Sequence, residues 1–242
     1  MSRTLAVITA RGGSKRIPGK NVRAIAGKPL ITWTVETARA CQERLHSIVL
    51  STDDEEIAQV GRHGGAEVPF LRPAHLAGDT ASSLGVVQHA TRFIEARDNV
   101  RFDWVLLLQP TSPLRTAADI FASLEMADAA GCDSVVAVTE MPVHPIFAKK
   151  INAKGLLKPF NGTEPEGLRR QDANPKAYIR NGAIYLTQRD VLLEQNSIYG
   201  SRILPYIMPP ERSIDIDVDL DFRLAELLLQ DRSELADLPC AD

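Results

Sequence analysis

Residues 5–21 read Leu-Ala-Val-Ile-Thr-Ala-Arg-Gly-Gly-Ser-Lys-Arg-Ile-Pro-Gly-Lys-Asn and join an apolar run to a glycine-rich loop. The apolar part predicts a buried strand, and a helical pattern begins near Pro29. Glycines that follow a buried strand can expose backbone N–H groups to a polyanion. The loop also carries four cations, Arg11, Lys15, Arg16 and Lys20. Together, these features predict a nucleoside triphosphate site rather than a basic surface turn.

Two common phosphate-binding motifs do not fit this loop. A Walker A loop has four residues between its glycines, followed by Gly-Lys and then a Ser or Thr. Here five residues separate Gly13 from Gly19, and Asn21 follows Lys20. The loop contains no Gly-x-Gly-x-x-Gly either. The sequence therefore argues against a P-loop hydrolase and against an NAD-dependent hydride-transfer enzyme.

The composition is that of an ordinary soluble protein with a sizeable core. The chain has 242 residues, of which 44% are hydrophobic and 24% are charged. Its net charge of -3 argues against nucleic-acid partners, and its apolar runs are too short for a signal peptide or a membrane span. Cys41, Cys132 and Cys240 lack metal-ligand spacing and favour a reducing compartment. We therefore expect a cytoplasmic protein without membrane or nucleic-acid partners.

Apolar runs alternate with helical patterns along most of the chain. Strands are predicted at 4–9, 46–51, 67–70, 103–109 and 133–138, and helices at 29–41, 54–63, 82–97, 117–130 and 218–230. This order predicts an α/β fold of three layers, with helices flanking a mostly parallel central sheet. Asp53 and Thr116 are predicted helix N-caps. Ligands of such sheets bind beyond the carboxyl ends of the strands, so the loop at Arg11, Ser51–Asp53 and Gln109–Ser112 should share one rim.

Residues 140–180 break this alternation because prolines and glycines interrupt them repeatedly. Short apolar pieces at 145–151 and 177–187 predict extended, hairpin-like segments. A structureless insert of this length is uncommon in a compact domain. We therefore interpret residues 1–242 as one domain that contains residues 140–180 as an insert. His144, between Val143 and Pro145, is interpreted as structural rather than as an acid or base.

Residues 214–219, Ile-Asp-Ile-Asp-Val-Asp, alternate strictly between apolar and acidic side chains. In a strand, Asp215, Asp217 and Asp219 would share one face. Three aligned carboxylates repel one another unless a cation neutralises them, and carboxylate oxygens suit Mg²⁺. The alternative is a solvent-facing edge with Asp219 as a helix N-cap.

Residues 10–21 resemble the signature loop of the acylneuraminate cytidylyltransferases (CMP-sialic acid synthetases), with Arg16 where members of that family often have glycine. The resemblance continues, in order, through Ser51–Asp54, Arg72-Pro73, Gln109–Pro113, Arg169–Asp172, Asn181–Tyr185 and Asp215–Asp217. It implies a Rossmann-like nucleotidyltransferase fold. It also implies transfer of CMP from CTP to the anomeric hydroxyl of an acidic nine-carbon sugar, a nonulosonic acid, with release of pyrophosphate.

The resemblance further implies roles for individual residues. Nucleotide contacts are expected from Arg11, Gly12, Gly13, Ser14, Lys15, Lys20, Asn21, Arg72, Ser83 and Gln109. Sugar contacts are expected from Gln109, Lys149, Arg170, Asn181 and Tyr185. The expected catalytic residues are Arg11, Lys20, Arg170 and Asp217. Asp215 and Asp217 would bind Mg²⁺, for which Mn²⁺ can substitute, and this leaves Asp219 to cap the following helix.

A homodimer is also implied, in which residues 140–180 protrude, pack on the second subunit and close its sugar pocket. Alternatives are a cytidylyltransferase for 3-deoxy-octulosonate or pseudaminate, a glycosyltransferase of similar fold, and a non-catalytic nucleotide-sensing homologue. Residues 181–185 resemble the sialic and legionaminic branches more than the pseudaminic one, and residues 205–213 lean towards the legionaminic branch. The base that activates the sugar hydroxyl stays open between a metal-bound hydroxide and a nearby carboxylate.

Overall fold

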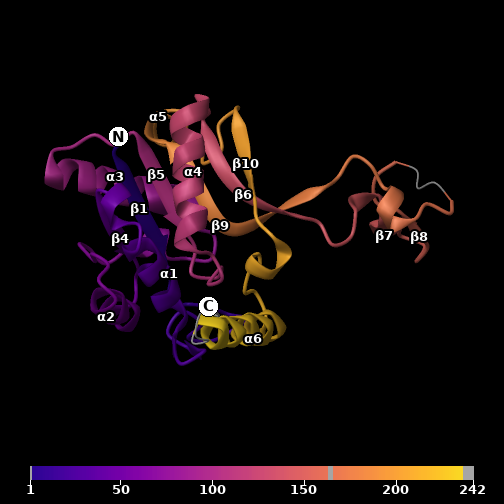
Figure 1. Cartoon of the computed structure of the whole chain (residues 1–242), viewed down its shortest axis with the longest axis horizontal. Coiled ribbons are helices and arrows are strands. Elements are labelled where there is room, and N and C mark those ends of the chain that lie inside the picture. The colour runs from indigo at the N-terminus through magenta and orange to yellow at the C-terminus, as the bar shows by residue number, and fades with distance from the viewer. Residues whose placement is uncertain (1, 163–165, 237–242) are drawn as a thin grey trace, which may run out of the picture.

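The computed structural model describes residues 2–162 and 166–236, and a six-stranded sheet with the order β10-β6-β9-β5-β1-β4 lies at its centre (Figure 1). The strands are β1 (Thr4–Thr9), β4 (Ser47–Ser51), β5 (Trp104–Leu108), β6 (Ser134–Glu140), β9 (Tyr178–Gln188) and β10 (Ile203–Ile207). Parallel pairing joins β1 to β4, β1 to β5, and β6 to β10. Of these six strands, only β9 is reversed, because it pairs antiparallel with both β5 and β6. The predicted mostly parallel sheet is confirmed.

Helices cover both faces of this sheet and make the predicted three layers. They are α1 (Leu30–Arg39), α2 (Glu55–His63), α3 (Ser83–Asp98), α4 (Ala117–Ala130) and α5 (Arg189–Leu193), whereas α6 (Asp219–Ala236) packs in a separate cluster. Residues of β1 alternate between two buried clusters, as the period of a strand requires. Ala6 and Ile8 pack with α1 and α4, whereas Leu5 and Val7 pack with α3 and α5.

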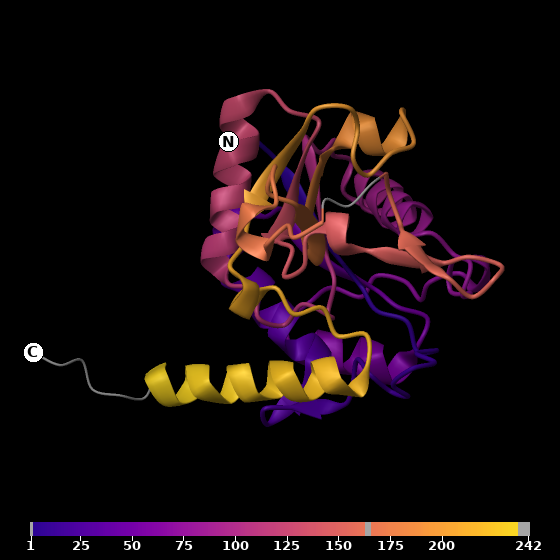
Figure 2. The same ribbon diagram turned by 90° about the vertical axis from the view of Figure 1, so that its right-hand side faces the viewer.

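A third buried cluster positions α6 beside the glycine-rich loop. Ile17 of the loop and Ile216 pack with Phe222 and Leu229 of α6. This cluster also includes Ile25, from the short hairpin of β2 (Ala24–Ile25) and β3 (Lys28–Pro29). Figure 2 shows α6 running below the sheet, next to the N-terminal part of the chain. The C-terminal helix α6 therefore packs on the glycine-rich loop and the β2–β3 hairpin, although residues 17–29 and 219–236 lie far apart in the sequence.

Several local predictions need correction. Asp54, not Asp53, caps α2, because its side chain accepts a hydrogen bond from the backbone N–H of Ile57 at 3.1 Å. Thr116 caps α4 as predicted, in a reciprocal capping box with Asp119. Residues 67–70 form no continuous strand, since only isolated bridges pair Glu67 and Leu71 with the β4 edge.

The elements β10 and α5 were missed by the sequence analysis. Pro205 lies in the middle of β10, and β10 is an edge strand, where the absence of an N–H is tolerated. The short α5 has only five residues, too few to show a helical period.

The insert protrudes from the body of the molecule (Figure 1). Strands β6 and β9 lead into it as a ribbon whose last pair is Glu140 and Tyr178. Beyond them, β7 (Lys149–Ile151) and β8 (Leu157–Pro159) form a separate antiparallel hairpin. Its surface carries the exposed apolar side chains of Ile151, Leu157 and Phe160. We call residues 141–177 the arm.

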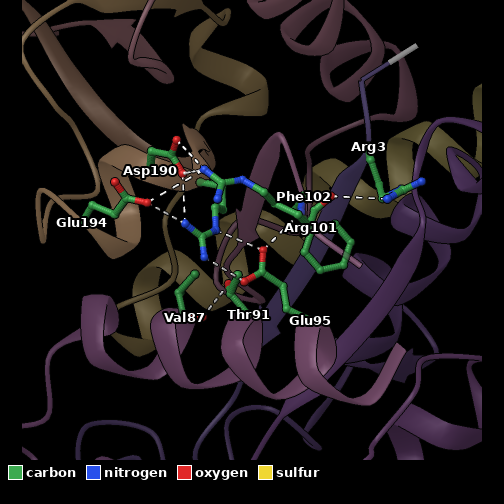
Figure 3. Close-up of polar contacts among 9 residues, drawn as sticks. Arg3, Val87, Thr91, Glu95, Arg101, Phe102, Asp190 and Glu194 are labelled. Atoms are coloured by element: carbon green, nitrogen blue, oxygen red, sulfur yellow. Dashed lines mark hydrogen bonds and ion pairs between the residues drawn. The ribbon is translucent and has the colours of Figure 1, made fainter. Parts of the chain in front are cut away.

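A network of ion pairs stabilises one end of the sheet (Figure 3). The glycine-rich loop lies at the opposite end. Arg189 at the start of α5 donates two hydrogen bonds of 3.1 Å to the carboxylate of Glu95 in α3. Arg101, which precedes β5, donates to both carboxylate oxygens of Asp190 at 2.6 and 2.7 Å. These contacts tie α3, α5 and β5 together and leave the carboxyl ends of the parallel strands open. Within the described residues, no helix is both long enough and apolar enough to span a bilayer.

Candidate functional site

The glycine-rich loop leaves β1 at its carboxyl end and contacts the end of β4. Ala10 donates its backbone N–H to the Ser51 carbonyl at 3.1 Å, and Gly12 donates to the Asp53 carboxylate at 3.2 Å. A Cβ at position 12 would lie 2.5 Å from a carboxylate oxygen of Asp54, so only glycine fits there. The Asn21 amide donates to the Arg11 carbonyl at 3.0 Å and fixes the start of the loop. The predicted shared rim of the loop and Ser51–Asp53 is confirmed.

Not every backbone N–H of the loop faces outward. Gly12 donates to Asp53, and Ser14 donates to the Gly12 carbonyl at 2.9 Å. These two N–H groups therefore have protein oxygens as hydrogen-bond acceptors.

One cleft beside the loop has a volume of about 260 Å³. Its lining is Thr9, Arg11, Arg72, Leu76, Gly78, Asp79, Ala81, Ser83 and Val86. Arg72 is buried, and its guanidinium donates hydrogen bonds to the hydroxyl and the carbonyl oxygen of Ser51. Burial lowers the pKa of Arg72. Ser83 is the first residue of α3, whose N-cap Ser82 accepts a hydrogen bond from the Gly85 N–H. The cleft therefore combines a fixed cation with a helix N-terminus.

A second cleft, of about 420 Å³, lies on the other side of Arg11. It is lined by Arg11, Ser14, Lys15, Arg16, Ile17, Lys20 and Asp217. Arg11 lines both clefts, so a ligand that fills both would pass along its guanidinium. Four cations around one hollow suit a polyphosphate chain, because N–H donors and positive charge match its oxygens.

Lys20 joins the loop to the acidic segment near the C-terminus. Its ammonium donates a hydrogen bond to the Ile216 carbonyl at 2.7 Å. Burial, the larger effect, lowers the pKa of Lys20, whereas the charges of Asp217 and Asp215 raise it. Arg16 lies 3.5 Å from the Asp217 carboxylate. The loop cations and the two carboxylates therefore form one continuous charged surface.

The acidic segment is extended but pairs in no strand. Ile216 is fully buried and donates its N–H to the Thr111 carbonyl at 2.8 Å, while Asp215 and Asp217 lie on the opposite side. Removal from water raises the pKa of Asp215, a hydrogen bond from Thr111 lowers it, and the charge of Asp217 raises it further. The predicted alternation of faces is therefore right up to Asp217.

The alternation ends there, and the predicted cap at Asp219 is wrong. Asp219 is the first residue of α6 and pairs with Arg23 at 2.8 Å. The carboxylate of Asp221 instead accepts the N–H groups of Asp217 and Val218, both at 2.9 Å. A carboxylate one turn into the helix therefore caps α6, as the acidic member of a capping box does.

The donor set at Asp215 and Asp217 fits a magnesium ion that a substrate completes. The described residues hold no cluster of three or more His, Cys, Asp or Glu side chains suited to a metal. Magnesium, however, is commonly held by one or two carboxylates together with substrate phosphates. Loss of hydration and the like charge of Asp217 raise the pKa of Asp215, although the residue is exposed at the surface, and a divalent cation would relieve the repulsion between the two carboxylates.

Gly182, in the middle of β9, is the point where the residues that follow β5 and the acidic segment approach β9. Its φ of +74° lies in the region that favours glycine. A Cβ there would lie 3.0 Å from the Gln109 side-chain oxygen, 3.1 Å from the Ser112 hydroxyl and 3.2 Å from a carboxylate oxygen of Asp215. The structure therefore brings Gln109 and Asp215 together, and no pattern in the sequence pointed to Gly182 as their junction.

Two of the predicted sugar contacts on β9 have partners inside the protein. The Asn181 amide donates to the Ser213 hydroxyl at 2.9 Å, and its side-chain oxygen accepts from the Ala183 N–H at 3.2 Å. Tyr185 is half-buried, its ring centroid lies 6.2 Å from that of Tyr199, and burial raises its pKa. Asn181 thus holds β9 against the segment that precedes the acidic residues.

Lys149 and Arg170 lie in the arm, away from both clefts of their own chain. Both side chains are exposed. His144, also in the arm, accepts from the Ile146 N–H through Nδ1, and its Nε2 lies 2.9 Å from the Pro175 carbonyl. Its interpretation as a structural residue is confirmed, because both ring nitrogens have backbone partners.

The sequence analysis missed Arg115, which is buried beneath the site. Its guanidinium donates to the Ala183 carbonyl at 2.6 Å and to the Thr34 hydroxyl at 2.9 Å. Complete burial lowers its pKa to about 10. No local pattern distinguishes this arginine from a surface one, since its partners lie far away in the sequence.

Comparisons with known proteins agree with this geometry. The family described as cytidylyltransferase matches residues 5–236. A CMP-N,N'-diacetyllegionaminic acid synthase of Legionella pneumophila is 40% identical over 233 residues, which cover 94% of this chain and 97% of that protein. A pseudaminic acid cytidylyltransferase of Campylobacter jejuni is 33% identical over 234 residues, covering 97% and 99%. The solved structure of a CMP:2-keto-3-deoxy-manno-octonic acid synthetase complexed with CTP shares the fold, with a TM-score of 0.67 at 20% identity and coverage of 96% and 100%.

Proposed function

This chain belongs to the cytidylyltransferase family, and from that membership we propose that it transfers CMP from CTP to the anomeric hydroxyl of N,N'-diacetyllegionaminate. Its relatives make the CMP derivatives of several nonulosonic acids, so the chain is a nucleotidyltransferase that activates a sugar of this class. The choice of legionaminate rests on the synthase that is 40% identical over nearly the whole chain. CTP is an intracellular nucleotide, so the proposal keeps the cytoplasmic location expected from the sequence.

The pair of clefts that share Arg11 is the observation that carries the use of a nucleoside triphosphate. We propose that the base and ribose occupy the cleft of Arg72 and Ser83. The triphosphate then passes along Arg11 into the cleft of Lys15 and Lys20. Gln109 lies beyond the end of β5, where it can contact both nucleotide and sugar.

Asp215 and Asp217 would hold the magnesium ion that the resemblance implies. When bound, the ion would bring phosphate oxygens together and reduce their negative charge. Both carboxylates lie within the electrostatic reach of Lys20. Manganese is proposed as a substitute, because it accepts the same oxygen ligands.

The protein's own part in the reaction would be to position the reactants and to stabilise charge. The anomeric hydroxyl loses its proton to a base and its oxygen forms a bond to the α-phosphorus, while the bond from that phosphorus to the oxygen shared with the β-phosphorus breaks and negative charge moves onto pyrophosphate. Arg11, Lys15 and Lys20 line the hollow in which that charge would collect. Fixed cations need no rearrangement as the charge develops, so they stabilise the transition state more than water does.

We propose that the arm packs on a second subunit and completes the sugar pocket of that subunit. Lys149 and Arg170 are far from their own clefts, and the arm carries exposed apolar side chains at Ile151, Leu157 and Phe160. Apolar groups of this size are suited to burial between subunits. In a homodimer, Arg170 of one chain would grip the sugar carboxylate in the other, since arginine binds carboxylates through two parallel hydrogen bonds.

A pyrophosphate-release assay tests this function. We expect release with CTP and not with ATP, GTP or UTP, and faster release with N,N'-diacetyllegionaminate than with N-acetylneuraminate, pseudaminate or 3-deoxy-octulosonate. Faster turnover of another acid would reject legionaminate while retaining the reaction. Absence of release with every acid, from a protein that still binds CTP, would favour a nucleotide-sensing homologue.

A further inference from the structure

Asp79 bridges two cations of the glycine-rich loop. Its carboxylate oxygens lie 3.0 Å from the Arg11 guanidinium and 2.5 Å from the Lys15 ammonium. Asp79 itself belongs to another segment, between the short helical turn Ala74–Leu76 and α3. The same residue lines the cleft of Arg72 and Ser83. An anion of the protein therefore already contacts two of the cations that the proposed triphosphate needs.

The ion pairs of Asp79 with Arg11 and Lys15 can be replaced by other contacts at little cost in stability. The side chains of Arg11, Lys15 and Asp79 are 37%, 77% and 48% exposed. Ion pairs at such sites contribute little to stability, because water competes for both partners. A hydrogen bond from Lys15 is the main cause that holds the pKa of Asp79 below its usual value. The carboxylate is consequently ionised at neutral pH.

The turns of the segment that carries Asp79 are held by backbone hydrogen bonds within the segment. Ala77 donates its N–H to the Ala74 carbonyl and Ala81 donates to the Gly78 carbonyl. A Cβ added at Gly78 would meet no heavy atom within 4 Å, so the segment is not tightly packed there. The Asp79 carboxylate thus ties a loosely packed segment to the glycine-rich loop, and breaking its two ion pairs leaves the local turns in place.

We propose that Asp79 is an internal competitor for phosphate, which CTP displaces from Arg11 and Lys15 and which returns to them when pyrophosphate leaves. A carboxylate and a phosphate oxygen offer the same charge and accept the same N–H donors. While Asp79 is in place, it neutralises part of the positive field that attracts the triphosphate. Asp79 therefore weakens phosphate binding and limits how long the product pyrophosphate is retained. This inference rests on the proposed use of CTP.

The opposite role, in which Asp79 holds Arg11 and Lys15 ready for the triphosphate, makes the opposite prediction. Removal of a positioning carboxylate would weaken the binding of CTP. Removal of a competing carboxylate would strengthen it, and would do so for any ligand that presents phosphates to these cations. The direction of the change in affinity therefore separates the two roles.

Isothermal titration of CTP and of inorganic pyrophosphate into the full-length protein tests the inference without turnover. Asp79→Asn keeps the size of the side chain and removes its charge. We expect both ligands to bind roughly tenfold more tightly, since two exposed ion pairs no longer compete. Asp79→Glu retains the charge and should bind them within about twofold of the wild type. Asp128→Asn on α4, which loses an ion pair with Arg44, should match the wild type.

The binding of pyrophosphate by Asp79→Asn is the result that decides the inference. Unchanged or weaker binding of pyrophosphate by Asp79→Asn overturns the inference, and so does a gain for CTP that is not shared by pyrophosphate. An equal gain in Asp128→Asn would reduce the effect to net charge and would also overturn it. If the wild type binds no CTP, the proposed function itself fails, and the inference fails with it. A wild type that binds CTP while Asp79→Asn shows no gain overturns the inference alone.

Discussion

The ammonium of Lys20 lies 2.7 Å from the backbone carbonyl oxygen of Ile216, although 196 positions separate the two residues in the sequence. This hydrogen bond holds a cation of the first loop at the acidic segment, where the charges of Asp217 and Asp215 act on it. Ile216 is in turn buried against Ile17 and Phe222. The loop, the acidic segment and α6 therefore pack together, and changes in any of them should affect the same site.

Replacement of Lys20 by alanine should reduce turnover at least about a hundredfold, because removing one donor that stabilises developing charge typically costs that much. The fold should survive, since the aliphatic part of Lys20 is not a member of the buried clusters. Steady-state rates and circular dichroism of Lys20→Ala, with Arg62→Ala as an exposed control on α2, provide the test. Near-normal rates from a folded Lys20→Ala protein would show that the loop is not the triphosphate site.

Asparagine at position 215 or 217 should make activity depend on high magnesium. Either change removes a charge from the proposed metal ligands, so activity should collapse at ordinary magnesium and partly recover at high magnesium or with manganese. Asp219→Asn is the matched control, because it breaks an exposed pair with Arg23 that contributes about 1 kcal/mol or less. Initial rates in a magnesium titration should separate the variants. A large defect in Asp219→Asn alone would move the metal assignment along the chain.

The raised pKa of Asp215 predicts that Asp215→Asn stabilises the metal-free protein at neutral pH. Loss of hydration and the charge of Asp217 make ionisation of Asp215 harder in the folded chain than in the unfolded chain, although the residue is exposed at the surface. The stability that the group contributes is therefore full below its unfolded pKa and is lost as pH rises through its folded pKa. Asparagine cannot ionise and avoids that loss.

Thermal unfolding in the presence of a metal chelator tests the direction of this change in stability with pH. The melting temperature of Asp215→Asn relative to the wild type should increase between about pH 4, near the unfolded pKa of an aspartate, and neutral pH. Saturating magnesium should reduce the difference, since a bound cation would stabilise the ionised wild type. A variant whose relative stability falls as pH rises would contradict the proposed environment of Asp215.

Gly182→Ala should damage both stability and activity. Its positive φ alone costs an alanine about 1–2 kcal/mol, and its Cβ would crowd Gln109, Ser112 and Asp215. Gly131→Ala, at the end of α4, also has a positive φ but meets no atom within 4 Å. It should lose stability from the backbone term alone and keep its turnover. Denaturant unfolding and steady-state rates measure both effects, and equal turnover of the two variants would show that the junction at Gly182 does not shape the site.

A mixture of Lys20→Ala and Arg170→Ala proteins should regain activity if sites are shared between subunits. Each homodimer of one variant carries its lesion in both sites. In a mixed dimer, one site carries both lesions and the other carries neither. Exchange of subunits should therefore restore up to about a quarter of wild-type activity per chain, counting random pairing of the two variants. Light scattering that reports a monomer, or a mixture that stays inactive after exchange, would argue against the shared site.

The local features of this fold were predictable because neighbours in the sequence determine them. The alternation of buried residues in β1 follows from the period of a strand. The cap of α4 depends on Thr116 and Asp119, three positions apart. The cap of α2 was misplaced by one residue, because Asp53 and Asp54 are equally good caps and the choice depends on Gly12, which takes Asp53 as its partner.

The sequence by itself determined the alternating strands and helices, the cationic loop at residues 10–21 and its resemblance to one enzyme family. Only the tertiary structure decided the reversed direction of β9, the pairing of Lys20 with Ile216 and the position of Asp79 on Arg11 and Lys15. The physical reason is the separation of the interacting residues in the sequence. The period of a strand or helix, its caps and its turns depend on residues a few positions apart. The three contacts named above instead depend on how the buried clusters bring distant segments together. A sequence pattern therefore indicates local structure directly, whereas long-range contacts become visible only once the side chains are packed.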